Sequence, residues 1–178
     1  MSIEDYFDVE FNAFKVMSAS DGMGGETTGS PYRAYTNDPA AGSNIELNMA
    51  NTSGFIVGDV VTVSSSAGSE IAIITVVHTN THITVDKLVL NHTKINPKVY
   101  NGFTFNGAID LISGSKNMVA AQYAERATHI LLCPIGIALE SKHLIDDGIS
   151  KWRILNIDDP VRRGHHLEVI LEYIGVSG

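Results

Sequence analysis

The C-terminal segment His-His-Leu-Glu-Val-Ile-Leu-Glu-Tyr-Ile, residues 165–174, limits most strongly how this chain can fold. Its apolar and polar residues alternate with a period of two, which places them on opposite faces of an extended strand. The apolar face consists of Leu167, Val169, Leu171 and Tyr173, and the polar face of His166, Glu168 and Glu172. We therefore expect a strand that turns one face to a hydrophobic core.

Two further apolar runs, residues 127–134 and 152–157, precede this strand. Each has the length of a strand and is bounded by Pro, Gly or Asp, residues that end extended segments. The polar residues that lead to Asp147 and Gly148 are expected to form turns. We expect Trp152 to be buried with Leu167, Val169 and Leu171.

The N-terminal part also has strand-like composition. Residues 1–8 are polar and acidic and form either a short arm or a first helical turn. Residues 9–18 are expected to be a strand, with the glycine-rich residues 21–25 as a hairpin tip and an irregular strand over 26–36. Another strand is expected at 105–112.

Residues 37–100 differ in composition from both flanks. They are rich in Thr, Val, Ile, Ser and Asn, and they carry few charges. Short β-branched runs at 60–63, 70–77 and 82–86 alternate with tight polar turns, a pattern typical of a β-meander. We expect a small inserted β-barrel or sandwich domain here, with residues 91–99 as its return path.

The charge and composition exclude several classes of protein. Of 178 residues, 12 are basic and 20 acidic, giving a net charge of −8, which argues against a surface that grips nucleic acid through its phosphates. The single cysteine, Cys133, lies in an apolar run and is expected to be a buried, inert thiol. No apolar run is long enough to predict a membrane span.

Catalytic and metal-binding patterns are weak. His165 and His166 are adjacent, so a strand would send them to opposite faces, and His78 and His82 flank a turn with no further ligand at a recognisable spacing. The pairs Asp146-Asp147 and Asp158-Asp159 precede Gly or Pro, where Asp serves turns. We expect no enzyme activity, no metal and no cofactor.

Two short motifs carry a resemblance to a known family. They are Ala-Thr-His-Ile-Leu-Leu-Cys-Pro at 127–134 and Asp-Pro, a loop to Gly164, and His-His-Leu-Glu, within 159–168. Their order and spacing resemble the head-closure, or stopper, proteins of tailed bacteriophages, which dock beneath the portal ring and join the DNA-filled head to the tail. The resemblance covers residues 9–36 and 101–175.

The resemblance implies a discontinuous core domain, residues 1–36 and 101–178, interrupted by the inserted β domain at 37–100. The expected fold class is all-β and mainly antiparallel, a small barrel or sandwich core with one short helix or loop. The chain would form a ring, dodecameric by family resemblance, in the neck of the virion after assembly in the host cytoplasm. Portal or adaptor proteins would lie above it and tail or tail-terminator proteins below, and DNA would pass without sequence-specific binding.

Two segments are candidate functional sites. In the family, the segment at 111–126 points toward the channel axis and can block it. Here it is rich in small residues and weakly helical, which suits a gate, although a plain surface helix is the alternative. The gate residues are Ser113, Gly114, Ser115, Lys116, Asn117, Met118, Val119, Gln122, Tyr123, Glu125 and Arg126. The candidate subunit or partner contacts are Arg162, Arg163, His165 and His166.

Two other functions are compatible with the sequence. A tail-terminator or decoration protein of the same particle would also be acidic, β-rich and poor in motifs. A carbohydrate-binding β module, suggested by the Thr- and Asn-rich residues 37–100, would need an exposed aromatic platform, for which this segment offers Phe55 and, at its edge, Tyr100.

Overall fold

The computed structural model describes residues 7–15, 17–20, 26–29, 32–111, 126–158 and 165–177. Every regular element in this part of the chain is a β-strand, so the expected all-β fold class is confirmed. Within the same residues, no helix is long and apolar enough to cross a membrane. The short helix or loop expected at 113–126 lies outside the described residues except for Arg126.

Contacts divide the chain into two compact units. The first consists of Met1–Ala13 and Thr104–Gly178, and the second of Phe14–Phe103. The inserted domain was expected over 37–100, so this division assigns further residues on both flanks to the second unit.

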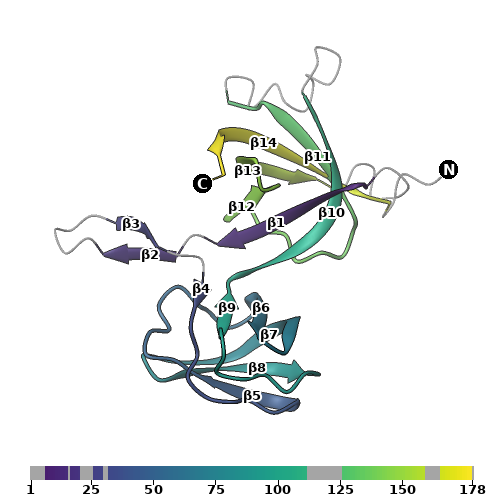
Figure 1. Ribbon diagram of the computed structural model, residues 1–178. Helices are drawn as coiled ribbons and strands as arrows, with labels where there is room; N and C mark the ends of the chain where they lie inside the picture. The colour runs from purple at the N-terminus through teal and green to yellow at the C-terminus, as the bar shows by residue number, and fades with distance from the viewer. Residues whose placement is uncertain are drawn as a thin grey trace. The chain divides into compact units, whose positions relative to one another are not determined.

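The first unit is a closed barrel of six strands in the order β1, β10, β11, β14, β13, β12 (Figure 1). The strands are β1 (Val9–Lys15), β10 (Gly102–Leu111), β11 (His129–Cys133), β12 (His143–Asp146), β13 (Ser150–Asp158) and β14 (Leu167–Val176). The printed registers from β10 to β12 are antiparallel. Lys15 N donates to Asn101 O at 2.9 Å, which sets the end of β1 beside the start of β10 and makes this pair antiparallel too.

Strand β14 is hydrogen-bonded on both edges. It pairs with β11 from His129↔Leu171 to Cys133↔Leu167, and with β13 from Ser150↔Val176 to Asp158↔Glu168. On β10, a Cβ added at Gly107 would lie 2.8 Å from the carbonyl oxygen of Leu132. This contact requires glycine, because real Cβ atoms do not approach so closely, and it lets β10 pack tightly against β11.

The expected core face of β14 is partly confirmed. Val169 and Leu171 are fully buried and Trp152 almost so, whereas Leu167 is half-buried and Tyr173 is exposed. Both residues lie at the limits of the pairing between β14 and β11. Leu167 is opposite Cys133, the last residue of β11, and Tyr173 lies two residues beyond Leu171, which is opposite His129, the first residue of β11. The alternation therefore predicted a face of the strand but not how far along β14 the neighbouring strands cover it.

One strand of the barrel was not predicted from the sequence. The polar region before Asp147 was expected to form only turns, but it contains β12, where Leu144↔Arg153 and Asp146↔Lys151 pair with β13. Ile145 is fully buried, while its neighbours Leu144 and Asp146 are half-buried. With four residues and one fully buried aliphatic side chain, β12 has too little alternation to be recognised.

The antiparallel barrel has two distinct ends. At one end, β10, β12 and β14 finish and β1, β11 and β13 begin. Leu111, Arg126 and the turn at Asp147 and Gly148 therefore lie at this end. Strand β13 finishes and strand β14 begins at the other end.

The second unit is built on a six-stranded sheet in the order β4, β9, β6, β7, β8, β5. Its strands are β4 (Tyr32–Arg33), β5 (Gly42–Asn48), β6 (Val60–Ser65), β7 (Gly68–His78), β8 (His82–Leu88) and β9 (Lys98–Tyr100). A separate pair, β2 (Met17–Ser20) with β3 (Glu26–Gly29), flanks the expected hairpin tip at 21–25, which lies outside the described residues. The meander strands expected at 60–63, 70–77 and 82–86 correspond to β6, β7 and β8.

Strand β5 was also not predicted from the sequence, because residues 37–43 were expected only to interrupt the preceding strand pattern. Residues 42–48 pair with β8, although their sequence is mostly polar. The outer edge of β5 is covered locally: Asn37 Nδ2 donates to Glu46 O at 2.8 Å, and Asn37 Oδ1 accepts from Asn48 N at 3.0 Å. One side chain thus satisfies edge groups that would otherwise be open to another strand.

A buried ion pair joins distant parts of the second unit. Lys15 Nζ contacts Asp59 Oδ1, and both side chains are buried. Asp59 Oδ2 also accepts from Ile56 N at 3.0 Å and from Asn101 Nδ2 at 3.1 Å, and Asn101 donates to Gly54 O at 2.9 Å. Lys15 and Asn101 lie where the chain enters and leaves this unit, so the cluster ties its two ends to its core.

We predict that Lys15→Met lowers the free energy of unfolding by about 3–5 kcal/mol, because it leaves the buried Asp59 carboxylate without its cation. Urea denaturation of the full chain measures this change. The control is Lys94→Met, which removes an exposed pair with Asp38 (3.8 Å) and should change stability by about 0.5 kcal/mol or less. Equal effects of the two substitutions would contradict the role assigned to Lys15.

Candidate functional site

Among the candidate gate residues, the structure describes only Arg126; Ser113 to Glu125 lie outside the described residues. Arg126 makes a bidentate ion pair with Glu172, with Nε to Oε1 at 3.0 Å and Nη2 to Oε2 at 2.8 Å. These hydrogen bonds raise the pKa of Arg126 and lower that of Glu172. Arg126 therefore anchors the start of the β11 region to β14.

Neighbouring backbone contacts strengthen this anchor. Thr128 N donates to Leu171 O at 2.8 Å, and Tyr173 N donates to Thr128 Oγ1 at 2.8 Å. On the other side of β14, Arg153 Nη1 donates to Glu172 Oε2 at 3.1 Å. One carboxylate thus receives two guanidinium groups, one from each flank of the strand.

The candidate partner contacts are only partly described. Arg162 and Arg163 lie outside the described residues. His165 is exposed, and His166 is half-buried with Nε2 at 3.5 Å from Glu168 Oε1. His166 Nδ1 is buried and has no hydrogen-bond partner. In the ranges that the structure describes, His165 and His166 do not meet further groups that would make a binding site.

The two motif segments meet in the barrel. Residues 129–133 form β11 and residues 167–168 begin β14, and these strands pair directly, with Cys133 opposite Leu167 and Leu132 opposite Glu168. Cys133 is fully buried, and burial raises the pKa of its thiol to about 12. A thiol held neutral in this way is a poor nucleophile, which agrees with the inert role expected for it.

Five large apolar side chains near one end of the barrel are exposed, and we call this region the apolar end. They are Leu111, Ile149, Tyr173, Ile174 and Val176. Ile149 and Val176 are exposed to 74% and 71%. Ser177 N donates to Ile149 O at 2.8 Å, which holds the end of β14 beside the turn before β13.

The turn that carries Ile149 is well ordered by hydrogen bonds. Asp147 Oδ1 accepts from Ile149 N at 2.9 Å and from Ser150 N at 2.7 Å. Asp146 Oδ1 accepts from Gly148 N, and Asp146 also contacts Ser177 Oγ. These contacts are the turn chemistry expected for the pair, and they present Ile149 on a fixed backbone.

Aromatic side chains lie next to the apolar end. The Trp152 ring packs edge-on against His129 at 5.7 Å, Tyr173 at 6.5 Å and Phe11 at 6.3 Å between ring centroids. Burial lowers the pKa of His129. Trp152 Nε1 is buried without a hydrogen-bond partner. Trp152 therefore contacts both the buried Phe11 of the barrel core and the exposed Tyr173.

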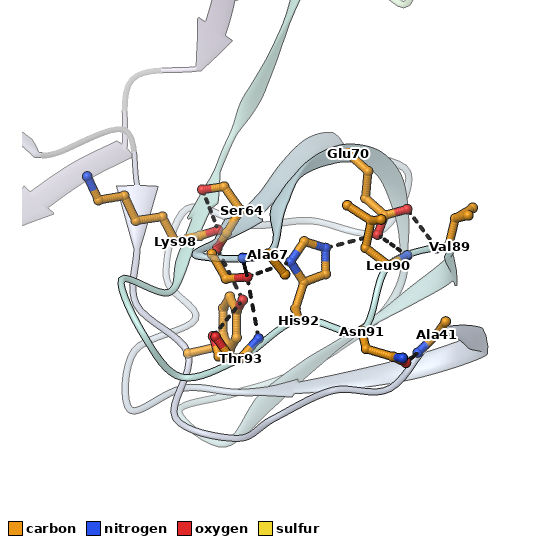
Figure 2. A network of polar contacts seen from close by, with 12 residues as sticks. Ala41, Ser64, Ala67, Glu70, Val89, Leu90, Asn91, His92, Thr93 and Lys98 are labelled. Atoms are coloured by element: carbon orange, nitrogen blue, oxygen red, sulfur yellow. Dashed lines mark hydrogen bonds and ion pairs between the residues drawn. The ribbon is translucent and has the colours of Figure 1, made fainter.

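The second unit contains a Ser–His–Glu arrangement that sequence reasoning missed (Figure 2). His92 is fully buried, with Nε2 at 2.9 Å from Glu70 Oε1 and Nδ1 at 3.0 Å from Ser65 Oγ. Glu70 also accepts from Val89 N at 2.7 Å and Leu90 N at 2.9 Å. No spacing in the sequence signals this group, because the three residues come from two strands and a loop.

The geometry favours a structural role for this network over catalysis. Ser65 Oγ accepts from Ala67 N at 3.1 Å and Thr93 N at 3.4 Å, so both of its lone pairs are engaged. A nucleophile needs a free lone pair directed at a substrate, and here the imidazole is also fully buried. The network instead fastens residues 89–93 to β6 and β7.

Histidine pairing does not create a metal centre. His78 and His82 lie directly opposite each other, with ring centroids 4.3 Å apart, and His82 Nε2 is 3.9 Å from Glu46 Oε1. In the part of the chain that the structure describes, no three or more His, Cys, Asp or Glu side chains are arranged to hold a metal ion.

Neither of the two aromatic side chains considered for carbohydrate binding is fully exposed. Phe55 is buried in the core of the second unit, and Tyr100 is half-buried with Phe14 at 6.0 Å. Tyr32 is exposed and pairs with Tyr100, but Lys98 Nζ lies 5.0 Å above its ring. Phe55 therefore cannot serve as a stacking surface.

Comparison of the chain with models of protein families found no match, and comparison with curated proteins found none either.

The Glu70 network predicts an acid-sensitive contribution to stability. Burial alone would raise the pKa of Glu70, but hydrogen bonds from Val89, Leu90 and His92 lower it overall. A carboxyl group with a lowered folded pKa stabilises fully above the ordinary glutamate pKa of about 4.3, and this stabilisation is lost as the pH falls below that value.

We therefore predict that Glu70→Gln lowers the free energy of unfolding by about 1–3 kcal/mol at pH 7, and by much less near pH 3. Urea denaturation at the two pH values measures both numbers. Glu46→Gln, which alters an exposed carboxyl group, is the matched control and should have little effect. If Glu70→Gln lowers the free energy of unfolding equally at both pH values, the stabilisation does not depend on the negative charge of Glu70.

Proposed function

We propose that this chain is a structural protein of the head–tail connector of a tailed bacteriophage. It docks as a ring under the portal or its adaptor, helps to retain the packaged DNA and provides a surface for tail attachment. The proposal rests on the resemblance to head-closure proteins carried by residues 127–134 and 159–168. One structural observation supports it: these separate segments contribute adjacent, directly paired strands, β11 and β14, of one closed barrel.

The surface chemistry is compatible with this role. A net charge of −8 disfavours tight binding to DNA phosphates, as suits a channel through which DNA slides. The described part of the barrel places its large exposed apolar side chains mainly at one end, which is the composition of a protein contact. A tail-terminator or decoration protein is the alternative, and it differs in where the protein sits in the particle.

The gating role of residues 113–126 remains part of the proposal. Leu111, before this segment, and Arg126, its last residue, lie at the apolar end of the barrel, and Arg126 is paired with Glu172. In this proposal, Arg126 anchors the C-terminal end of the segment to β14.

We predict that deleting residues 115–125 and bridging the gap with Gly-Ser leaves ring formation intact but makes completed phage heads leak DNA. Native mass spectrometry measures the ring, and nuclease protection of head DNA measures retention. Lys142→Ala, which lies outside the segment in the connection between β11 and β12, is the control and should retain DNA. Heads that hold DNA and accept tails normally after the deletion would remove the gating role.

A further inference from the structure

The buried cluster of Lys15, Asp59 and Asn101 brings together an amine, a carboxylate and an amide. The exposed fractions of the three residues are 8%, 1% and 0%, and all three belong to the second unit. A neutral lysine amine is a nucleophile, and it can displace the nitrogen of a side-chain amide to form a new amide bond. The cluster therefore contains the groups of a covalent reaction as well as those of an ion pair.

The Asp59 carboxylate contacts both groups that would react. Its Oδ1 contacts Lys15 Nζ, and its Oδ2 accepts from Asn101 Nδ2 at 3.1 Å. A side chain that takes a proton from the attacking amine and gives one to the departing nitrogen must reach both atoms. Asp59 has this position.

Backbone hydrogen bonds fix the three residues relative to one another. Lys15 N donates to Asn101 O at 2.9 Å, so these two residues lie opposite each other on neighbouring antiparallel segments. Asp59 O accepts from Ile74 N at 2.9 Å, and Asp59 N donates to Ile56 O at 3.2 Å. Groups held side by side in this way react without the entropy cost of a bimolecular encounter.

Asn101 is held through its amide nitrogen. Nδ2 donates to Gly54 O at 2.9 Å as well as to Asp59, whereas the buried Oδ1 has no hydrogen-bond partner among the described residues. A buried carbonyl oxygen without a donor is costly, so a hydrogen-bonding role alone does not explain this arrangement. The contacts converge on the nitrogen atom that would leave in the reaction.

We propose that Lys15 and Asn101 form an intramolecular isopeptide bond, with Asp59 as the proton carrier. The ion pair of Lys15 with Asp59 is the state before the reaction. Asp59 takes a proton from the ammonium group, and the neutral amine attacks Cγ of Asn101. The Nζ–Cγ bond forms and the Cγ–Nδ2 bond breaks. Nζ loses a second proton and Nδ2 gains one through Asp59, so Nδ2 leaves as ammonia and Asp59 ends protonated.

The bond would close the second unit covalently where the chain enters and leaves it. Such a cross-link restricts the unfolded chain as a disulfide does, here over the residues between 15 and 101. A force transmitted along β1 and β10 would pass through the bond and bypass the sheet of this unit. The reaction involves the second unit only, so its outcome is independent of the proposed position beneath the portal.

Intact-mass spectrometry of the folded full chain tests the proposal. We expect a mass about 17 Da below that of the sequence, which is the mass of the ammonia that leaves. Trypsin does not cleave after an acylated lysine, and Lys15 is the only lysine or arginine before Arg33. The digest should therefore contain residues 1–33 joined to residues 99–116, and tandem mass spectrometry should place the branch at Lys15 and Asn101.

Two variants separate this reaction from others. Asp59→Asn removes the proton carrier at nearly constant shape, and Lys15→Arg keeps the positive charge but removes the amine. Both should retain the full mass, with folding checked by the dispersion of the NMR spectrum. A succinimide at Asn101 and Gly102 also releases ammonia, but it does not need Lys15 and gives no branched peptide.

A wild-type chain of full mass, or an ammonia loss that persists in Lys15→Arg, would overturn the proposal. A branch between Lys15 and Asp59, with the loss of a water molecule, would contradict the role assigned to Asp59. The mass and the branch of the wild-type chain decide the question even if a variant does not fold.

Discussion

The barrel depends on the backbone pairing of β14 with β11 on one edge and β13 on the other. Strand β14 supplies Val169 and Leu171 to the core and Glu172 to the surface, so one strand fixes both the packing and the ion pairs. Its pairing also brings the two sequence motifs into contact, because Cys133 lies opposite Leu167. Loss of this strand would open the barrel, expose two sheet edges and separate the segments on which the proposed function rests.

Buried polar contacts add to the strand pairing that holds the second unit together. The buried Lys15–Asp59 pair and Asn101 join the two ends of the unit, and the Glu70–His92 network holds the loop before β9. Buried charges are expensive to desolvate, so they contribute specificity only when each partner is present.

Much of the fold can be predicted from the sequence, whereas little of the candidate site can. Clear alternation or β-branched runs predicted β6, β7, β8, β11, β13 and β14. Strand β12 and strand β5 were missed, since one is very short and the other is mostly polar and gains its strand character from pairing with β8. No local pattern could reveal the exposure of Tyr173, the anchoring of Arg126 on Glu172 or the pairing of Lys15 with Asp59. Each depends on contacts between residues that are distant in sequence.

The central claim is that the chain forms a ring beneath the portal. Electron microscopy of the purified protein mixed with the portal protein of the same phage tests this claim most directly. We expect a ring of density on the tail-facing side of the portal, with the same rotational axis. Portal images that are identical with and without the protein would contradict this claim.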